Sequence, residues 1–248
     1  TLSLADKNEV PPDCSAIIVA GPDRSISQNE AELLRGYLQK NGRMLLMLDP
    51  STKTGFEDIV EEWGLSLRND VVFDPYNTLT GRELFVKEYG EHPITKRMKG
   101  IVTQFYMPRS IMLVASGSAN SSAADRPRIT MLASCSDRGW AETDLNTSPA
   151  SFDEGSDTMG PVAVAAAIEK GPTGSIDIDI EPTRIVIVGD SIFVSNRAMS
   201  RGAGGNRDLF MNMVNWLLER ENLMAIAPKL PGELKLDIDS RSATWLLA

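Results

Sequence analysis

The chain has 248 residues, with 25 Lys and Arg against 34 Asp and Glu, one His and two Cys. Hydrophobic residues make up 42% of it, which is typical of a soluble globular protein and excludes disordered, collagen-like and disulfide-scaffold classes. A formal net charge of −9, with no cluster of Lys and Arg standing out along the sequence, argues against nucleic acid and anionic membrane surfaces as partners.

The first recognisable unit is a strand followed by a helix. Residues 16–20 are a short apolar run ended by Gly21, a pattern typical of a strand buried on both faces. Ser27 and Glu30 have capping-box spacing, and the apolar stripe that follows has helical period until Gly42 stops it. The sequence therefore predicts a strand, a turn and an amphipathic helix.

The alternation continues through the next thirty or so residues. Residues 44–48 predict a second strand, which makes a βαβ unit with parallel neighbouring strands and a right-handed crossover. A helix over 56–63 and a short strand over 71–73 follow. Three such repeats favour a doubly wound arrangement.

The middle of the chain is less regular. Residues 110–115 and 129–134 predict strands separated by a flexible loop over 116–122. The run 162–168 fits a strand or a helix, and its bounding prolines favour the strand. Residues 184–188 predict another buried strand of the parallel type.

The last predicted helix begins with Asn206 as its N-cap and runs to Leu217. After it, residues 230–238 predict an edge strand or an extended arm. We therefore expect an α/β domain over 1–226 with a three-layer, doubly wound, mostly parallel sheet of the Rossmann-like kind, and a C-terminal extension over 227–248. The apolar end of that extension is either a tail docked on the core or the first turns of a membrane helix.

Candidate ligand-binding residues are those that end the strands, because ligands of open α/β sheets bind at the carboxyl ends of the strands. They should form one rim, rich in carboxylates that suit polyol or sugar hydroxyls, or a hard cation, and repel phosphate. The members of this rim are Gly21, Pro22, Asp23, Asp49, Gly189, Asp190, Ser191 and Asn196. The alternative is that these residues only terminate strands and cap helices.

The sequence predicts no catalytic residue, no metal site and no cofactor. His92 is the one histidine, GxSxG is absent, and neither Cys14 nor Cys135 lies at a predicted strand-to-helix elbow. The two cysteines lack CxxC spacing, so two thiols are favoured over a disulfide. The glycines over 202–205 match neither GxGxxG nor GxxxxGK[ST], which does not support nucleotide binding.

Ten ordered segments of this sequence are similar to one known family. They are Val10–Asp13, Ile17–Pro22, Glu32–Leu38, Leu46–Pro50, His92–Thr95, Arg109-Ser110, Trp140–Glu142, Gly160–Ala165, Gly189–Asn196 and Asn206–Leu217. The sequence resembles the auxiliary component of uncharacterised ABC-type transport systems, the GldG-like gliding-motility family.

That resemblance implies a fold related to class I glutamine amidotransferases and to a domain of an intraflagellar transport protein. It implies a domain on the extracytoplasmic (periplasmic) side of the cytoplasmic membrane, tethered by membrane segments outside this sequence, with an ABC permease and ATPase as partners. Carbohydrate is an implied possible ligand. The amidotransferases use a Cys–His–Glu triad that this sequence lacks, so a non-catalytic binding or coupling domain is expected. The alternatives are an amidotransferase-like or hydrolytic enzyme and a purely structural assembly module.

Overall fold

The computed structural model describes residues 2–5, 7–114, 126–146, 149–171, 181–200 and 204–220. The loop predicted over 116–122, the edge strand predicted over 230–238 and the extension over 227–248 lie outside these residues, so they stay predictions. No helix in the part of the chain described is both long and apolar enough to cross a membrane.

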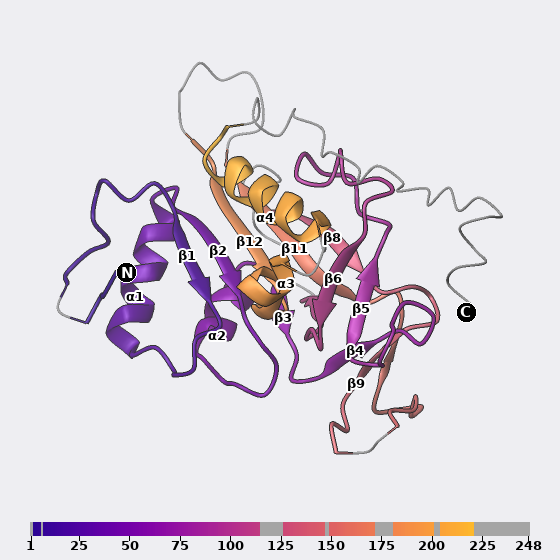
Figure 1. Ribbon diagram of the computed structural model, residues 1–248. Helices are drawn as coiled ribbons and strands as arrows, with labels where there is room; N and C mark the ends of the chain where they lie inside the picture. The colour runs from indigo at the N-terminus through magenta and orange to yellow at the C-terminus, as the bar shows by residue number, and fades with distance from the viewer. Residues whose placement is uncertain are drawn as a thin grey trace, which may run out of the picture.

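The main sheet has seven strands, and helices pack against both of its faces (Figure 1). Its strand order is β1 (Ile17–Ala20), β2 (Arg43–Met47), β12 (Thr183–Val188), β11 (Ala163–Lys170), β7 (Ile111–Leu113) and β3 (Leu65–Leu67), and β8 (Arg128–Ser134) also pairs with β11. β1, β2 and β12 are parallel to one another, whereas every pair made by β11, β7 and β3 is antiparallel.

Two small sheets complete the strand inventory of the described residues. In one, β4 (Val71–Phe73), β9 (Trp140–Glu142) and β10 (Thr158–Met159) pair antiparallel; in the other, β5 (Glu83–Val86) pairs antiparallel with β6 (Thr103–Tyr106). The strand β4 was predicted from the sequence, but as part of the doubly wound unit. The strands β3, β5, β6, β9 and β10 were not predicted. All five missed strands have at most four residues, too few to show a period.

The prediction of a three-layer, doubly wound, mostly parallel sheet is therefore wrong. β11 and β12 follow each other in the chain and pair antiparallel, from Ala165 opposite Val188 to Lys170 opposite Thr183. Each strand contains a continuous apolar run, 163–168 in β11 and 185–188 in β12, because both faces are buried there, a pattern more common in parallel sheets. Such a pattern reports burial on two faces and does not report strand direction.

The elements over residues 17–62 were predicted well. α1 (Gln28–Gln39) begins after Ser27, whose side chain and that of Glu30 form the expected capping box, and β1 and β2 are parallel neighbours as expected. α2 (Phe56–Glu62) lies where a helix was predicted. The run after Pro161 is the strand β11 and not a helix.

Alternate residues of β2 and β12 point to opposite faces of the sheet and enter two different cores. Met44, Leu46, Ile185 and Ile187 pack with residues of α1 and α2. On the other face, α4 (Gly204–Leu217) covers the sheet.

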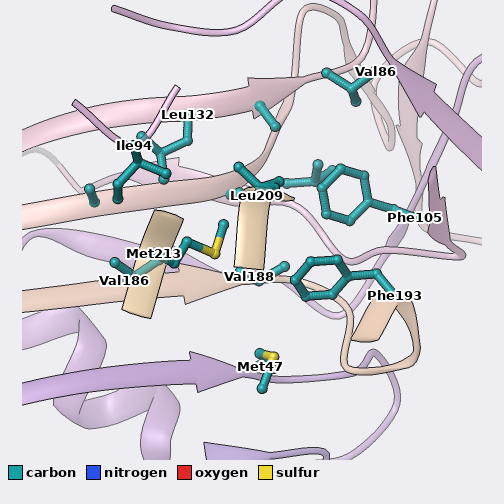
Figure 2. Packing of buried hydrophobic residues seen from close by; sticks show 14 of the residues in the cluster. Met47, Val86, Ile94, Phe105, Leu132, Val186, Val188, Phe193, Leu209 and Met213 are labelled. Atoms are coloured by element: carbon teal, nitrogen blue, oxygen red, sulfur yellow. The ribbon is translucent and has the colours of Figure 1, made fainter. Parts of the chain in front are cut away.

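The core beneath α4 joins the main sheet to the β5–β6 sheet (Figure 2). Leu209 and Met213 of α4 belong to the same buried cluster as Val186 and Val188 of β12 and Leu132 of β8, which are strands of the main sheet. The rings of Phe105, from β6, and Phe193, from the short 3₁₀ helix η2 (Ile192–Val194), lie 5.3 Å apart in a tilted arrangement. This core fixes β6 and η2 next to the carboxyl end of β12.

Asn206 is not the N-cap of α4, because the helix begins at Gly204 and Asn206 lies within it. Its side chain is fully buried and binds other segments. Its Oδ1 accepts from the N–H of Gln104 at 2.7 Å, and its Nδ2 donates to the carbonyls of Gln104 at 2.7 Å and Phe193 at 2.8 Å. Asn206 thus provides hydrogen-bond partners for backbone groups of β6 and η2 that have no partner in a neighbouring strand.

Replacing Asn206 with Ala is expected to reduce the free energy of unfolding by about 3 kcal/mol, because one buried N–H and two carbonyls lose their partner. Asn212→Ala is the matched control: Asn212, on the same helix, makes one bond from Nδ2 to the carbonyl of Ile94, so we expect a loss of about 1 kcal/mol. Denaturant unfolding measures both, and equal losses would contradict the bridging role of Asn206.

Candidate functional site

Part of the predicted rim is one hydrogen-bonded unit at the carboxyl ends of β1, β2 and β12. The backbone N–H and the hydroxyl of Ser191 each donate to a carboxylate oxygen of Asp49, both at 2.6 Å. Gly21 faces this pair with φ +54°, and a Cβ there would lie 2.6 Å from the Ser191 Oγ and 3.1 Å from an Asp49 oxygen. Gly21 is therefore required for the close approach of β1 to the Asp49–Ser191 pair.

Asp190 lies in the same turn but its side chain points inward and is fully buried. One carboxylate oxygen accepts from the N–H of Tyr106 at 2.7 Å and the other from the N–H of Ile192 at 2.6 Å. Asp190 therefore connects the end of β12 to β6 and to η2. Neither oxygen is open to a ligand at the surface.

The protonation of Asp190 is set by competing effects. Burial raises its pKa to about 7, the N–H groups of Tyr106 and Ile192 act against this rise, and the nearby Asp49 carboxylate adds to it. The group consequently changes charge near neutral pH in the folded protein.

The remaining rim residues differ in exposure. Asp23 and Asn196 are exposed, and Pro22 is half-buried. Gly189 lies against Arg109, whose carbonyl oxygen would be 2.1 Å from a Cβ at that position. The rim therefore has an inner part, where Asp190 is buried and Gly21, Asp49 and Ser191 are half-buried, and an outer edge where Asp23 and Asn196 are exposed to solvent.

Sequence reasoning missed the buried ion pair behind this rim. Arg109 is 3% exposed and donates to Glu57 Oε1 at 3.0 Å, to the Arg68 carbonyl at 2.8 Å and to the Leu67 carbonyl at 3.1 Å. The second oxygen of Glu57 accepts from the backbone and hydroxyl of Thr54. The spacing of Thr54 and Glu57 before α2 is a capping-box signal that could have indicated this carboxylate; nothing local in the sequence pairs it with Arg109.

One group of carboxylates has the spacing of a cation site. Ligand atoms of Glu142, Asp153 and Asp157 lie within 4.8 Å of one another. Two of these side chains already accept internal hydrogen bonds. Glu142 accepts from Trp140 Nε1 and from the N–H of Asp144, and Asp157 accepts from the backbone of Thr143 and Asp153. These bonds explain the clustering without an ion.

His92 and the cysteines occupy separate environments. The His92 ring packs edge-on against Trp216 with centroids 4.7 Å apart, and its Nδ1 accepts from the N–H of Ile94 at 3.2 Å. Burial lowers the pKa of His92 to about 4. Cys135 Sγ is buried and accepts from the N–H of Val162, and burial raises its pKa, while Cys14 Sγ donates to the Ala16 carbonyl. Both cysteines are free thiols.

The comparisons with known proteins place the chain in a family and show its fold. Residues 1–219 match the family model described as "ABC-type uncharacterized transport system". The chain is similar to the solved structure titled "mmIFT52 N-terminal domain", with 16% identity, a TM-score of 0.55, and coverage of 82% of this chain and 76% of that one. This likeness concerns the fold alone, and it agrees with the expected relation to an intraflagellar transport domain. No curated protein matches the chain.

We expect Asp190 to make stability fall as the pH rises. In the folded protein its pKa is about 7, and the ordinary value is 3.8, so the folded state binds the proton more tightly between these values. The contribution of Asp190 to the free energy of unfolding is therefore full below about pH 4 and falls by up to about 4 kcal/mol by about pH 7. Asp190→Asn keeps a neutral side chain throughout.

Denaturant unfolding of both proteins at intervals from about pH 4 to about pH 8 tests this. The quantity of interest is the free energy of unfolding of the parent minus that of Asp190→Asn, which should decrease with pH. A difference that is constant or that increases with pH would show that the folded carboxyl is ionised throughout.

Proposed function

This chain belongs to the family of auxiliary components of ABC-type uncharacterized transport systems, and on that premise we propose that it is a non-catalytic binding or coupling domain. In this proposal it lies on the extracytoplasmic, periplasmic side of the cytoplasmic membrane and is tethered by segments outside this sequence. Its partners are the ABC permease and ATPase. A role in gliding motility, as in GldG-like proteins, is the finer form of the same proposal.

The observation that carries the proposal is that the two inner carboxylates of the rim, Asp49 and Asp190, are hydrogen-bonded within the protein itself. A general acid or base must reach a substrate proton, and a nucleophile must have a base in contact. Asp49 is bound to Ser191, Asp190 is bound to backbone, and His92 contacts Trp216 and backbone. Each of these groups thus has a structural use, and this favours recognition over catalysis.

A carbohydrate is the second candidate, as a ligand of the outer edge of the rim. Asp23 and Asn196 are exposed there and offer carboxylate and amide groups of the kind that bind sugar hydroxyls. The acidic character of the chain, with a net charge of −9, favours a neutral ligand such as a glycan over a phosphorylated one.

We expect His92→Gln and Cys135→Ala to leave function intact. The measurement is transport, or ATP hydrolysis coupled to it, by the complete transporter reconstituted with the full-length protein carrying each substitution. Circular dichroism of each variant establishes that it is folded. A folded variant whose activity falls by about tenfold or more would favour the enzyme alternative, since losing a catalytic base or nucleophile typically lowers rates by 10²-fold or more.

We expect a neutral oligosaccharide, if it is the ligand, to raise the Tm of the chain in a saturable way, because a compound that binds only the folded state stabilises it by mass action. Asp23→Ala and Asn196→Ala should remove that shift, and Glu61→Ala, an exposed carboxylate on α2, should not. A flat response across a panel of oligosaccharides would reject the glycan and leave protein coupling as the proposed role.

A further inference from the structure

A second surface feature lies away from the rim, on the segment between β5 and β6. Residues 87–99 of this segment line a hollow of about 970 Å³. Four cations and two carboxylates line it: Lys87, Lys96, Arg97, Lys99, Glu88 and Glu91. We call this feature the basic hollow. Three of its cations, Lys96, Arg97 and Lys99, lie within four consecutive residues, so the chain does contain a short basic cluster, contrary to the expectation from the sequence.

The backbone that carries these cations is firmly held. Ile94 and Met98 are fully buried in the core beneath α4. The Ile94 carbonyl accepts from Asn212 of α4 at 2.9 Å, and the Tyr89 hydroxyl lies 2.8 Å from the Ile101 carbonyl, to which it donates. The segment is seen in Figure 1 in magenta, beside the end of α4. A fixed backbone reduces the ordering that binding would otherwise require.

The lysines of the basic hollow are available to a partner. Lys87, Lys96 and Lys99 are exposed, and none of them lies within 4.0 Å of a carboxylate in the part of the chain that the structure describes. By contrast, two buried arginines form ion pairs inside the protein: Arg109 with Glu57 and Arg184 with Glu169.

Charge and shape together select the class of partner. The hollow carries a net excess of positive charge on a chain whose total is −9, so it is a local site of attraction for an anionic group. Glu88 and Glu91 lie among the lysines, an arrangement that disfavours a uniformly anionic bilayer and suits an acidic protein segment whose carboxylates are spaced apart. A concave surface also accepts a protruding segment better than a flat membrane.

We propose that the basic hollow binds an acidic segment of a protein partner. The proposal concerns a site other than the rim and does not depend on the transporter role. Lys87, Lys96 and Lys99 provide the attraction, and Glu88 and Glu91 set the register of the bound segment by repelling a carboxylate placed opposite them.

The test uses the chain itself and a fluorescein-labelled peptide in which single glutamates are separated by Gly-Ser pairs, with binding followed by fluorescence anisotropy at about 20 mM and about 150 mM salt. We expect saturable binding that weakens with salt. The triple variant Lys87→Glu, Lys96→Glu, Lys99→Glu should raise Kd by about tenfold or more.

The matched control is Lys7→Glu, Lys40→Glu, Lys53→Glu, which changes the net charge by the same amount outside the basic hollow. It should change Kd by less than about twofold. Equal weakening by the two triple variants would show a general charge effect and overturn the proposal, as would the absence of saturable binding at low salt. Binding to phosphatidylglycerol vesicles without binding to the peptide would assign the hollow to a lipid surface and also overturn it.

Discussion

The structure depends on buried polar side chains that satisfy backbone groups of strand edges and of irregular segments. A main sheet that changes from parallel to antiparallel must be joined to smaller sheets by irregular segments, whose N–H and carbonyl groups are buried. Asp190 binds β6 and η2, Asn206 binds the same two segments from α4, and Arg109 binds carbonyls of the segment after β3. Among the described residues, no buried side-chain nitrogen or oxygen is left without a partner.

This constraint governs what the carboxyl ends of the strands can do. In open α/β sheets these ends are the usual place for a ligand, because polar groups collect there with nothing else to bind. Here the carboxylate of Asp49 accepts hydrogen bonds from Ser191, and that of Asp190 accepts one from Tyr106 of the neighbouring sheet. These polar groups therefore stabilise the junction between the sheets and are not left free to bind a ligand. The outer edge of the rim and the basic hollow both expose charged side chains. Such surfaces suit binding of another molecule more than catalysis of a reaction.

What the sequence could predict follows from the range of the interactions involved. The α1 cap at Ser27, the parallel β1–β2 pair and the identity of β11 as a strand depend on neighbours in the chain, and local pattern showed them. The antiparallel pairing of β11 with β12 depends on strand direction, and the bonds of Asn206 to Gln104 depend on a partner far away in the chain. A local residue pattern indicates neither. Seven of the eight rim residues lie just after β1, β2 or β12, and Asn196 lies after η2. Which of them face inward depends on the β5–β6 sheet, whose short strands show no periodic signal.

α4 is the element that relates the two surfaces. Asn206, near its start, binds β6 and η2 close to Asp190, whereas Asn212 and Trp216, near its end, contact Ile94 and His92 of the segment that carries the basic hollow. Its 14 residues span about 20 Å, and its apolar face is packed into the core along this length. A helix fixed at both ends holds two surfaces at a constant separation. The geometry therefore supports coupling through simultaneous contact with two partners, because a signal passed between them through the domain would require a second arrangement of α4.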